Sequence, residues 1–216
     1  MDIATEVRAA FEELRAALEE KLPEAARALR PPVPYDADWI DRPGAEELRA
    51  LWSVTSGHAD GMLGVAGGLR LLGPIDSEAE RAKWRELFDR GEGFDAVAQP
   101  EWDASQSLDP DAVRGVYFAA GWIPVLCEPM EGNYLAVDLV PLERGRAGQV
   151  ILCGRDEDDK CVVAPSLAAV LRALAAECRR GAWTLEKSES RDGKEHVYIE
   201  RDGGRLLSAC KDREFP

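Results

Sequence analysis

Four short runs of β-forming residues limit what this chain can fold into more than any other feature. They cover residues 123–127, 133–139, 148–153 and 160–163, and stretches rich in Pro, Gly and charged residues separate them. Separators this short allow antiparallel pairing, whereas a parallel crossover needs about a dozen residues or more. The pattern therefore predicts a largely antiparallel sheet in the second half of the chain.

Helical patterns lie on both sides of these runs. Apolar residues at steps of three and four give residues 3–22 a single apolar stripe. A proline followed by two glutamates predicts a second helix over 43–55, and Ser77 begins a capping-box sequence. Ser166 predicts the start of a further amphipathic helix, which Gly181 ends. We expect an α+β fold in which helices pack on a mixed, largely antiparallel sheet.

Turn and proline signals divide the chain into three parts. A proline-rich run at 31–34 stops the first helical segment. We expect an N-terminal helical segment at 1–30, a main domain at 36–181 and an extension at 182–216. Within the extension, Asp202-Gly203-Gly204 predicts the turn of a β-hairpin.

The charge balance narrows the classes of partner. The chain has 27 Lys and Arg and 41 Asp and Glu, which gives a net charge of −14. A nucleic-acid binder gains affinity by neutralising phosphates, and an anionic membrane also attracts basic segments, so neither is an expected partner. A basic protein is a compatible one. No signal peptide or apolar run of about 18 residues occurs, and the five cysteines show no CxxC spacing, so we expect a cytoplasmic protein with reduced thiols.

Candidate catalytic groups are sparse. The chain has two histidines, which argues against a His-rich metal site. His58 beside Asp60 is either a base oriented by a carboxylate or a loop histidine in solvent. Ser53 or Ser56 would complete a triad within eight residues, whereas triads usually gather distant parts of a chain. The cysteines in the β runs fit small core residues, and the glycines between 57 and 73 form no phosphate-binding motif. We expect no catalytic residue, metal or cofactor.

Acidic and aromatic loop residues are the candidates for binding a partner. The acidic run at 156–159 lacks the ligand spacing of a calcium loop, so it is either a solvated hairpin tip or a contact patch for a basic protein. Trp39 and Trp102 lie in loops, where either could be an exposed binding anchor. The candidate partner-binding residues are Asp36, Asp38, Trp39, Asp60, Trp102, Asp156, Glu157, Asp158 and Asp159.

Short motifs in residues 121–171 follow one another in a recognisable order. A Trp-Ile-Pro opening at 122–124 precedes a Gly-Asn-Tyr turn, a strand ending in Asp, a Gly-Gln-Val strand start and an Ala-Pro-Ser-Leu helix start. This order resembles the Smi/Knr cell-wall-assembly regulator family, the founding group of the SUKH superfamily, over about residues 36–180. The family-motif residues are Trp122, Pro124, Gly132, Asn133, Tyr134, Asp138, Gly148, Gln149 and Ser166.

The resemblance implies a SUKH-like, non-enzymatic protein-binding module. Fungal members are associated with cell-wall regulation, and many bacterial members are regarded as immunity proteins that neutralise a toxin. With the acidic charge, this implies an immunity protein against a basic toxin, or else a regulatory or scaffold protein with another partner. A hydrolase using Asp138 or the His58–Asp60 pair is a further alternative. Asp138 lies in an apolar strand, where a buried carboxylate either is catalytic or hydrogen-bonds to a turn.

Overall fold

The computed structural model describes residues 2–59, 62–63, 68–87, 107–116, 119–128, 132–189 and 195–215. Its helices are α1 (Ile3–Lys21), α2 (Pro23–Arg27), α3 (Glu46–Trp52), α4 (Pro74–Leu87), α6 (Leu167–Arg179) and α7 (Leu206–Lys211). Its strands are β1 (Met62–Leu63), β2 (Arg70–Leu71), β3 (Trp122–Cys127), β4 (Asn133–Asp138), β5 (Gln149–Gly154), β6 (Cys161–Ala164), β7 (Trp183–Glu189) and β8 (Glu195–Arg201).

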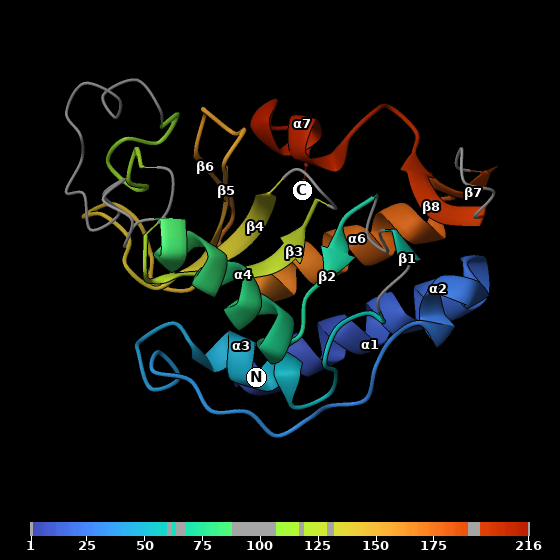
Figure 1. Ribbon diagram of the computed structural model, residues 1–216, viewed down its shortest axis with the longest axis horizontal. Helices are drawn as coiled ribbons and strands as arrows, with labels where there is room; N and C mark the ends of the chain where they lie inside the picture. Colours follow the sequence, from blue (N-terminus) through green and yellow to red (C-terminus); the bar gives the residue numbers. More distant parts are fainter. Residues whose placement is uncertain are drawn as a thin grey trace.

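The central sheet has five strands in the order β2-β3-β4-β5-β6, and every neighbouring pair is antiparallel (Figure 1). A smaller sheet has the order β1-β8-β7, in which β1 runs parallel to β8. The expected α+β class, with a largely antiparallel sheet, an N-terminal helix and a C-terminal hairpin, is therefore confirmed.

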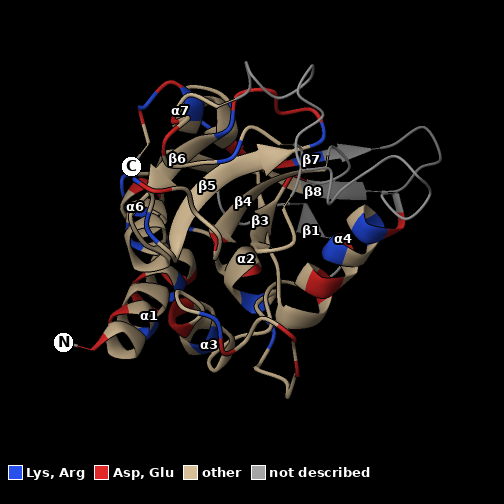
Figure 2. Ribbon diagram, turned by 90° about the vertical axis from the view of Figure 1, so that its left-hand side faces the viewer, with Lys and Arg blue, Asp and Glu red and all other residues tan. Residues whose placement is uncertain are grey.

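Helices cover both faces of the central sheet, with α1, α3 and α6 on one side and α4 on the other (Figure 2). Alternate side chains along the strands therefore enter two separate cores. The first core takes Ile123, Val125, Leu135, Val137, Val150 and Leu152. The second core takes Trp122, Cys127, Tyr134, Ala136, Ile151 and Cys153. Burial on both faces explains why every position of β3, β4 and β5 is buried.

Helix α1 joins the larger core through the stripe that its sequence predicts. Val7, Phe11, Leu14 and Leu18 are buried, and the helix packs against α6 and α3. Asp2 caps it by accepting a hydrogen bond of 3.0 Å from the amide of Thr5. The first helix of the chain is thus packed beside a helix that follows the last strand of the central sheet.

Two local predictions are wrong. Helix α4 begins at Pro74 rather than at Ser77, because a proline in the first turn lacks only an N–H that has no helical partner. The Asp202-Gly203-Gly204 turn leads into α7, whereas the hairpin is formed by β7 and β8 before it. In the described part of the chain, no helix combines the length and the apolar character needed to cross a membrane.

Candidate functional site

The motif residues fall into two groups at opposite ends of β3, β4 and β5. At one end, the strand register sets Trp122 opposite Asp138 and Asp138 opposite Gln149. At the other end, Asn133 lies opposite Gly154. Pro124 lies between the two groups, beside a register shift in β3, where a missing N–H is tolerated.

The Asp138 carboxylate organises the first end. It is fully buried, and one oxygen accepts a hydrogen bond from the Val140 amide at 2.9 Å, while the other accepts one from the Gln149 side chain at 3.0 Å. Burial raises the pKa of Asp138, and the Val140 and Gln149 donors oppose that rise. Gln149 also donates to the carbonyl of Ala112 at 3.2 Å. The carboxylate therefore ties the end of β4 to its turn and to β5.

Gly148 brings a second segment against this end of the sheet. Its φ of +91° suits glycine, and a Cβ there would lie 3.2 Å from the carbonyl oxygen of Gly44. A Cβ on Gly44 would lie 2.5 Å from the Gly148 nitrogen. The segment before α3 can approach the start of β5 this closely because both positions are glycine.

Asn133 organises the other end. Its amide nitrogen donates to Glu128 at 3.2 Å, and its side-chain oxygen accepts from the backbone amide of Asp156 at 3.0 Å. Gly132 supplies the left-handed turn before it, with φ +72°. A Cβ on Gly154 would collide with the Asn133 backbone. Asn133 therefore fixes the start of the acidic connection between β5 and β6.

Tyr134 links this end to α4. Its hydroxyl donates to Glu80 at 2.9 Å and accepts from the Trp84 indole at 3.3 Å. Burial and the nearby Glu80 charge raise the pKa of Tyr134, so the hydroxyl stays protonated. The motif tyrosine is thus a buried connector between the sheet and the helix.

The acidic run 156–159 is not uniformly solvated. Asp156 and Asp158 are exposed, whereas Glu157 is buried and pairs with Lys211 at 2.6 Å. Lys160 is also buried and donates to the Glu157 carbonyl at 2.5 Å. We call Asp156, Asp158 and Asp159 the acidic tip; Asp156 pairs with Arg155 at 2.7 Å, and the half-buried Asp159 lies 3.5 Å from Lys211. The interpretation of the whole run as a solvated hairpin tip is therefore corrected at Glu157.

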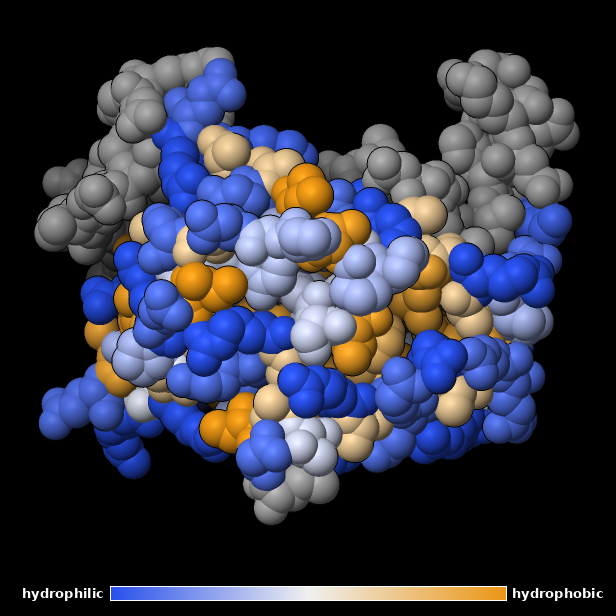
Figure 3. Space-filling model, turned by 90° about the horizontal axis from the view of Figure 1, so that it is seen from below, coloured by the Kyte–Doolittle hydropathy of each residue, from blue (hydrophilic) through white to orange (hydrophobic). Residues whose placement is uncertain are grey.

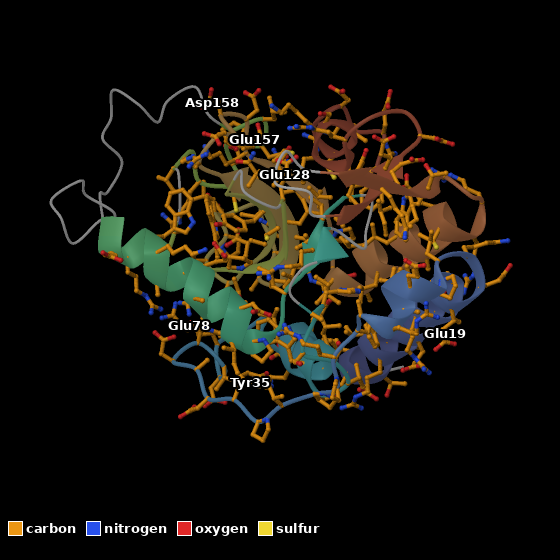
Figure 4. All side chains as sticks on the ribbon, turned by 45° about the vertical axis from the view of Figure 1, so that its right-hand side comes forward. Glu19, Tyr35, Glu78, Glu128, Glu157 and Asp158 are labelled. Carbon is orange, nitrogen blue, oxygen red and sulfur yellow. The ribbon has the colours of Figure 1, made fainter. Side chains whose placement is uncertain are left out.

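The other candidate acids lie far from the acidic tip. Asp36 and Asp38 are exposed, and Asp38 lies 3.6 Å from the Arg81 guanidinium of α4. Figure 4 places Glu157 and Asp158 at one end of the molecule, beside Glu128, and Tyr35 and Glu78 at the other end. The two acidic groups therefore do not converge.

Trp39 is not an exposed anchor. Its side chain is 2% exposed and its ring lies 5.4 Å from that of Trp52 and 6.5 Å from that of Tyr35. This aromatic cluster secures the segment before α3, which sequence alone could not place in the core. Asp60 and Trp102 lie outside the described residues. On the face seen from below, hydrophilic residues separate several small hydrophobic patches (Figure 3).

Of the candidate catalytic groups, Ser56 and His58 are buried and Ser53 is exposed. His58 is fully buried rather than in solvent, and burial lowers its pKa to about 3. All five cysteines are buried, and burial raises the thiol pKa of both Cys161 and Cys178 to about 11. Among the described residues, no group of three or more His, Cys, Asp and Glu is placed to hold a metal ion.

Two buried acids that the sequence analysis missed hold distant segments together. Glu47 of α3 accepts hydrogen bonds from the amides of Leu167 and Ala168 at 2.6 and 3.2 Å, at the start of α6. Ser166 accepts from the Ala169 amide at 3.1 Å, so it caps this helix as its sequence predicts. The signal at Glu47 is an acid four residues before Leu51, on the helix face that packs inward.

The second missed acid is Glu177 of α6. Its carboxylate accepts hydrogen bonds from Arg201 at 2.7 to 3.2 Å and from the Trp183 indole at 3.2 Å. Desolvation raises the pKa of Glu177, but these donors prevail and the net shift is downward. This pair joins α6 to β7 and β8.

Comparison with known proteins finds relatives of one kind. The chain is 35% identical over 130 residues to the cell wall biosynthesis/cell cycle regulator smi1 of Schizosaccharomyces pombe, which covers 59% of this chain and 26% of that protein. It is 43% identical over 81 residues to a glucan synthesis regulatory protein of Neurospora crassa, covering 38% and 15%. It is 36% identical over 86 residues to the cell wall assembly regulator SMI1 of Saccharomyces cerevisiae, covering 40% and 17%.

The chain spans about a quarter or less of the length of these relatives. No family model matches it. The names of these relatives nevertheless agree with the family that the motifs indicate. The resemblance to the Smi/Knr family is thereby confirmed for the part of the chain that these relatives match.

Proposed function

We propose that this chain is a non-enzymatic regulator that acts by binding another protein, and that the acidic tip lies at the centre of its binding surface. The proposal extends to this chain the regulatory role that its relatives' names state. We further propose that residues 36–181 form the binding domain, with a helical segment before it and an extension after it.

The observation that carries the proposal is the way Asn133 holds the acidic tip. One motif side chain bonds both to Glu128 and to the backbone amide of Asp156, so the tip begins at a fixed point; the Asp156 carboxylate is itself paired with Arg155, and Asp158 is exposed. A rigid charged projection loses little conformational freedom on binding, which favours affinity. A protein partner with a basic surface suits the acidic tip, since complementary charge raises the association rate.

An immunity protein against a basic toxin is the second candidate. The net charge of −14 favours it, because a toxin that acts on nucleic acid needs a basic surface and is attracted to an acidic inhibitor. Five buried free thiols support a reducing cytoplasmic location for either role.

The test is capture of partners by the tagged full chain from among the products of neighbouring genes, at low and high salt. The variant Asp156→Asn/Asp158→Asn removes two tip charges, and Asp36→Asn/Asp41→Asn removes two exposed charges from the opposite end. We expect the tip variant to bind more slowly and with a weaker salt dependence, while the control variant retains wild-type binding.

Equal binding by the wild type and the tip variant would reject the acidic tip as the binding surface. A toxin-like neighbour that is captured and inhibited would favour the immunity role over the regulatory one. Capture of a cell-wall enzyme or signalling protein, with no toxin among the neighbouring products, would favour the regulatory role.

A further inference from the structure

Strand β6 is the last strand of the central sheet, and its outer side faces no further strand in the described part of the chain. Such an edge exposes N–H and C=O groups that can pair with a strand of another molecule. Natural edges are usually protected by a charge or proline within the strand. The sequence of β6, Cys-Val-Val-Ala, contains neither.

The outward groups of Val162 are instead occupied by two side chains from elsewhere. The Val162 amide donates to Asp109 at 2.8 Å, and the Val162 carbonyl accepts from Arg213 at 3.3 Å. Asp109 and Arg213 are joined to each other by two hydrogen bonds of 2.9 and 3.1 Å. One ion pair therefore replaces the two groups that a neighbouring strand would offer.

The edge is occupied one step earlier as well. The Leu108 amide donates to the Lys160 carbonyl at 2.8 Å, and Ser107 forms a short parallel bridge with Lys160. The segment that carries Asp109 thus begins alongside the strand and leaves it at the ion pair. Beyond Lys160, the covering of the edge depends on side chains.

The backbone of Arg213 is held in an unfavourable conformation. Its φ is +61°, and it is the one residue other than glycine with positive φ in the described ranges. Such a conformation persists where the surrounding structure enforces it. The cause here is the C-terminal end of α7, where the amides of Arg213 and Glu214 donate to the carbonyls of Cys210 and Ala209 at 3.3 and 2.9 Å, as in a Schellman motif. This helix end places the Arg213 guanidinium beside the edge, within hydrogen-bond distance of the Val162 carbonyl.

We propose that the Asp109–Arg213 pair is an edge cap that prevents a second copy of this chain from adding to β6. A second copy is the fitting occupant because two antiparallel edges are self-complementary about a two-fold axis. The apolar, uncharged sequence of β6 adds to this tendency, since such segments favour strand pairing. The cap uses residues other than those of the acidic tip, so it does not rest on the proposed function, although Lys211 of α7 pairs with Asp159 at 3.5 Å.

The test compares the variants Asp109→Ala/Arg213→Gly and Arg213→Gly with the wild type. The matched control is Asp111→Ala/Arg144→Ala, which removes an ion pair of 3.9 Å whose side chains are both more than 70% exposed. Sedimentation velocity over a range of concentrations measures self-association, and hydrogen exchange at the Val162 amide measures exposure of the edge.

We expect the double cap variant to form larger species than the wild type as its concentration rises. Its Val162 amide should exchange roughly tenfold faster or more at low concentration, because it loses a hydrogen bond to a charged group. Arg213→Gly relieves the positive φ, so it keeps the fold while it frees the Val162 carbonyl, and it should self-associate as well.

Wild-type sedimentation of a folded Arg213→Gly variant, or wild-type Val162 exchange in a folded Asp109→Ala/Arg213→Gly variant, would overturn the proposal. Self-association of the Asp111→Ala/Arg144→Ala control would also overturn it, because the effect would then follow from lost surface charge rather than from the uncovered edge.

Discussion

Replacing Glu47 by alanine should destabilise the protein by detaching α3 from the start of α6. The substitution leaves the amides of Leu167 and Ala168 buried without their acceptor, whereas Ser166 still serves the next amide. It also removes an acidic group from the positive end of the helix dipole. The lost contact joins two residues that are 120 positions apart, so the substitution weakens the packing of two distant segments.

The expected loss is about 2–4 kcal/mol. Each hydrogen bond to a charged group contributes roughly 1.5–3 kcal/mol. Both amides donate to the same carboxylate oxygen, so the two contributions add to less than their sum. For a chain of this length, 1 kcal/mol lowers Tm by about 2–4 °C, so the variant should melt roughly 4–16 °C lower.

The assay is equilibrium unfolding in urea, followed by circular dichroism, with Glu47→Gln as the control that keeps an acceptor oxygen. Burial raises the pKa of Glu47 above its usual 4.5, although the Ala168 and Leu167 amides oppose this. The folded state therefore holds the proton more tightly, and the stabilisation is lost as the pH rises through the folded pKa. The advantage of wild type over Glu47→Gln should be largest below about 4.5 and smaller at neutral pH.

A Glu47→Ala variant within about 0.5 kcal/mol of wild type would refute this reasoning, because surface-like substitutions fall in that range. A wild-type advantage over Glu47→Gln that grows as the pH rises would refute the direction of the pKa shift.

Three further changes test other parts of the structure. Because burial lowers the pKa of His58 to about 3, the wild type should lose about 1.4 kcal/mol relative to His58→Leu for each pH unit between 6.5 and about 3; an equal difference in unfolding free energy between the two proteins at pH 7 and pH 5 would contradict this. Arg201→Ala leaves Glu177 buried and should cost about 3 kcal/mol or more by urea unfolding, whereas Arg180→Ala, whose side chain is 62% exposed, should cost about 1 kcal/mol or less. Gly154 has φ +147°, and in Gly154→Ala the new Cβ would collide with the neighbouring strand, which should cost more than about 1 kcal/mol. An unchanged Tm would show that the neighbouring strand shifts to make room.

The sequence predicted the elements whose signals are local. The apolar stripe of α1 and the cap at Ser166 each depend on residues within a few positions of one another, and each is present in the structure. The wrong start of α4 has the same local character, because Pro74 and Ser77 are competing start signals and the proline prevails.

Polar residues in the interior were not predictable in this way. Glu47 and His58 look like surface residues in the sequence, and their burial depends on segments far away in the chain. Trp39 looked free in its loop because its partner Trp52 lies in the following helix. Asn133 and Asp138 were singled out through the family resemblance, but their bonding partners emerged from the strand register.

The packing of α1 against α6 has a consequence for synthesis of the chain. The first helix is made long before its partner, and its apolar stripe has no place to bury until the strands and α6 have followed. At about 5–20 residues per second, this delay is on the order of ten seconds, during which an apolar surface is open to chaperones and to other nascent chains. Until α6 has formed and packed against α1, the acidic and basic side chains on the opposite side of α1 keep this helix soluble.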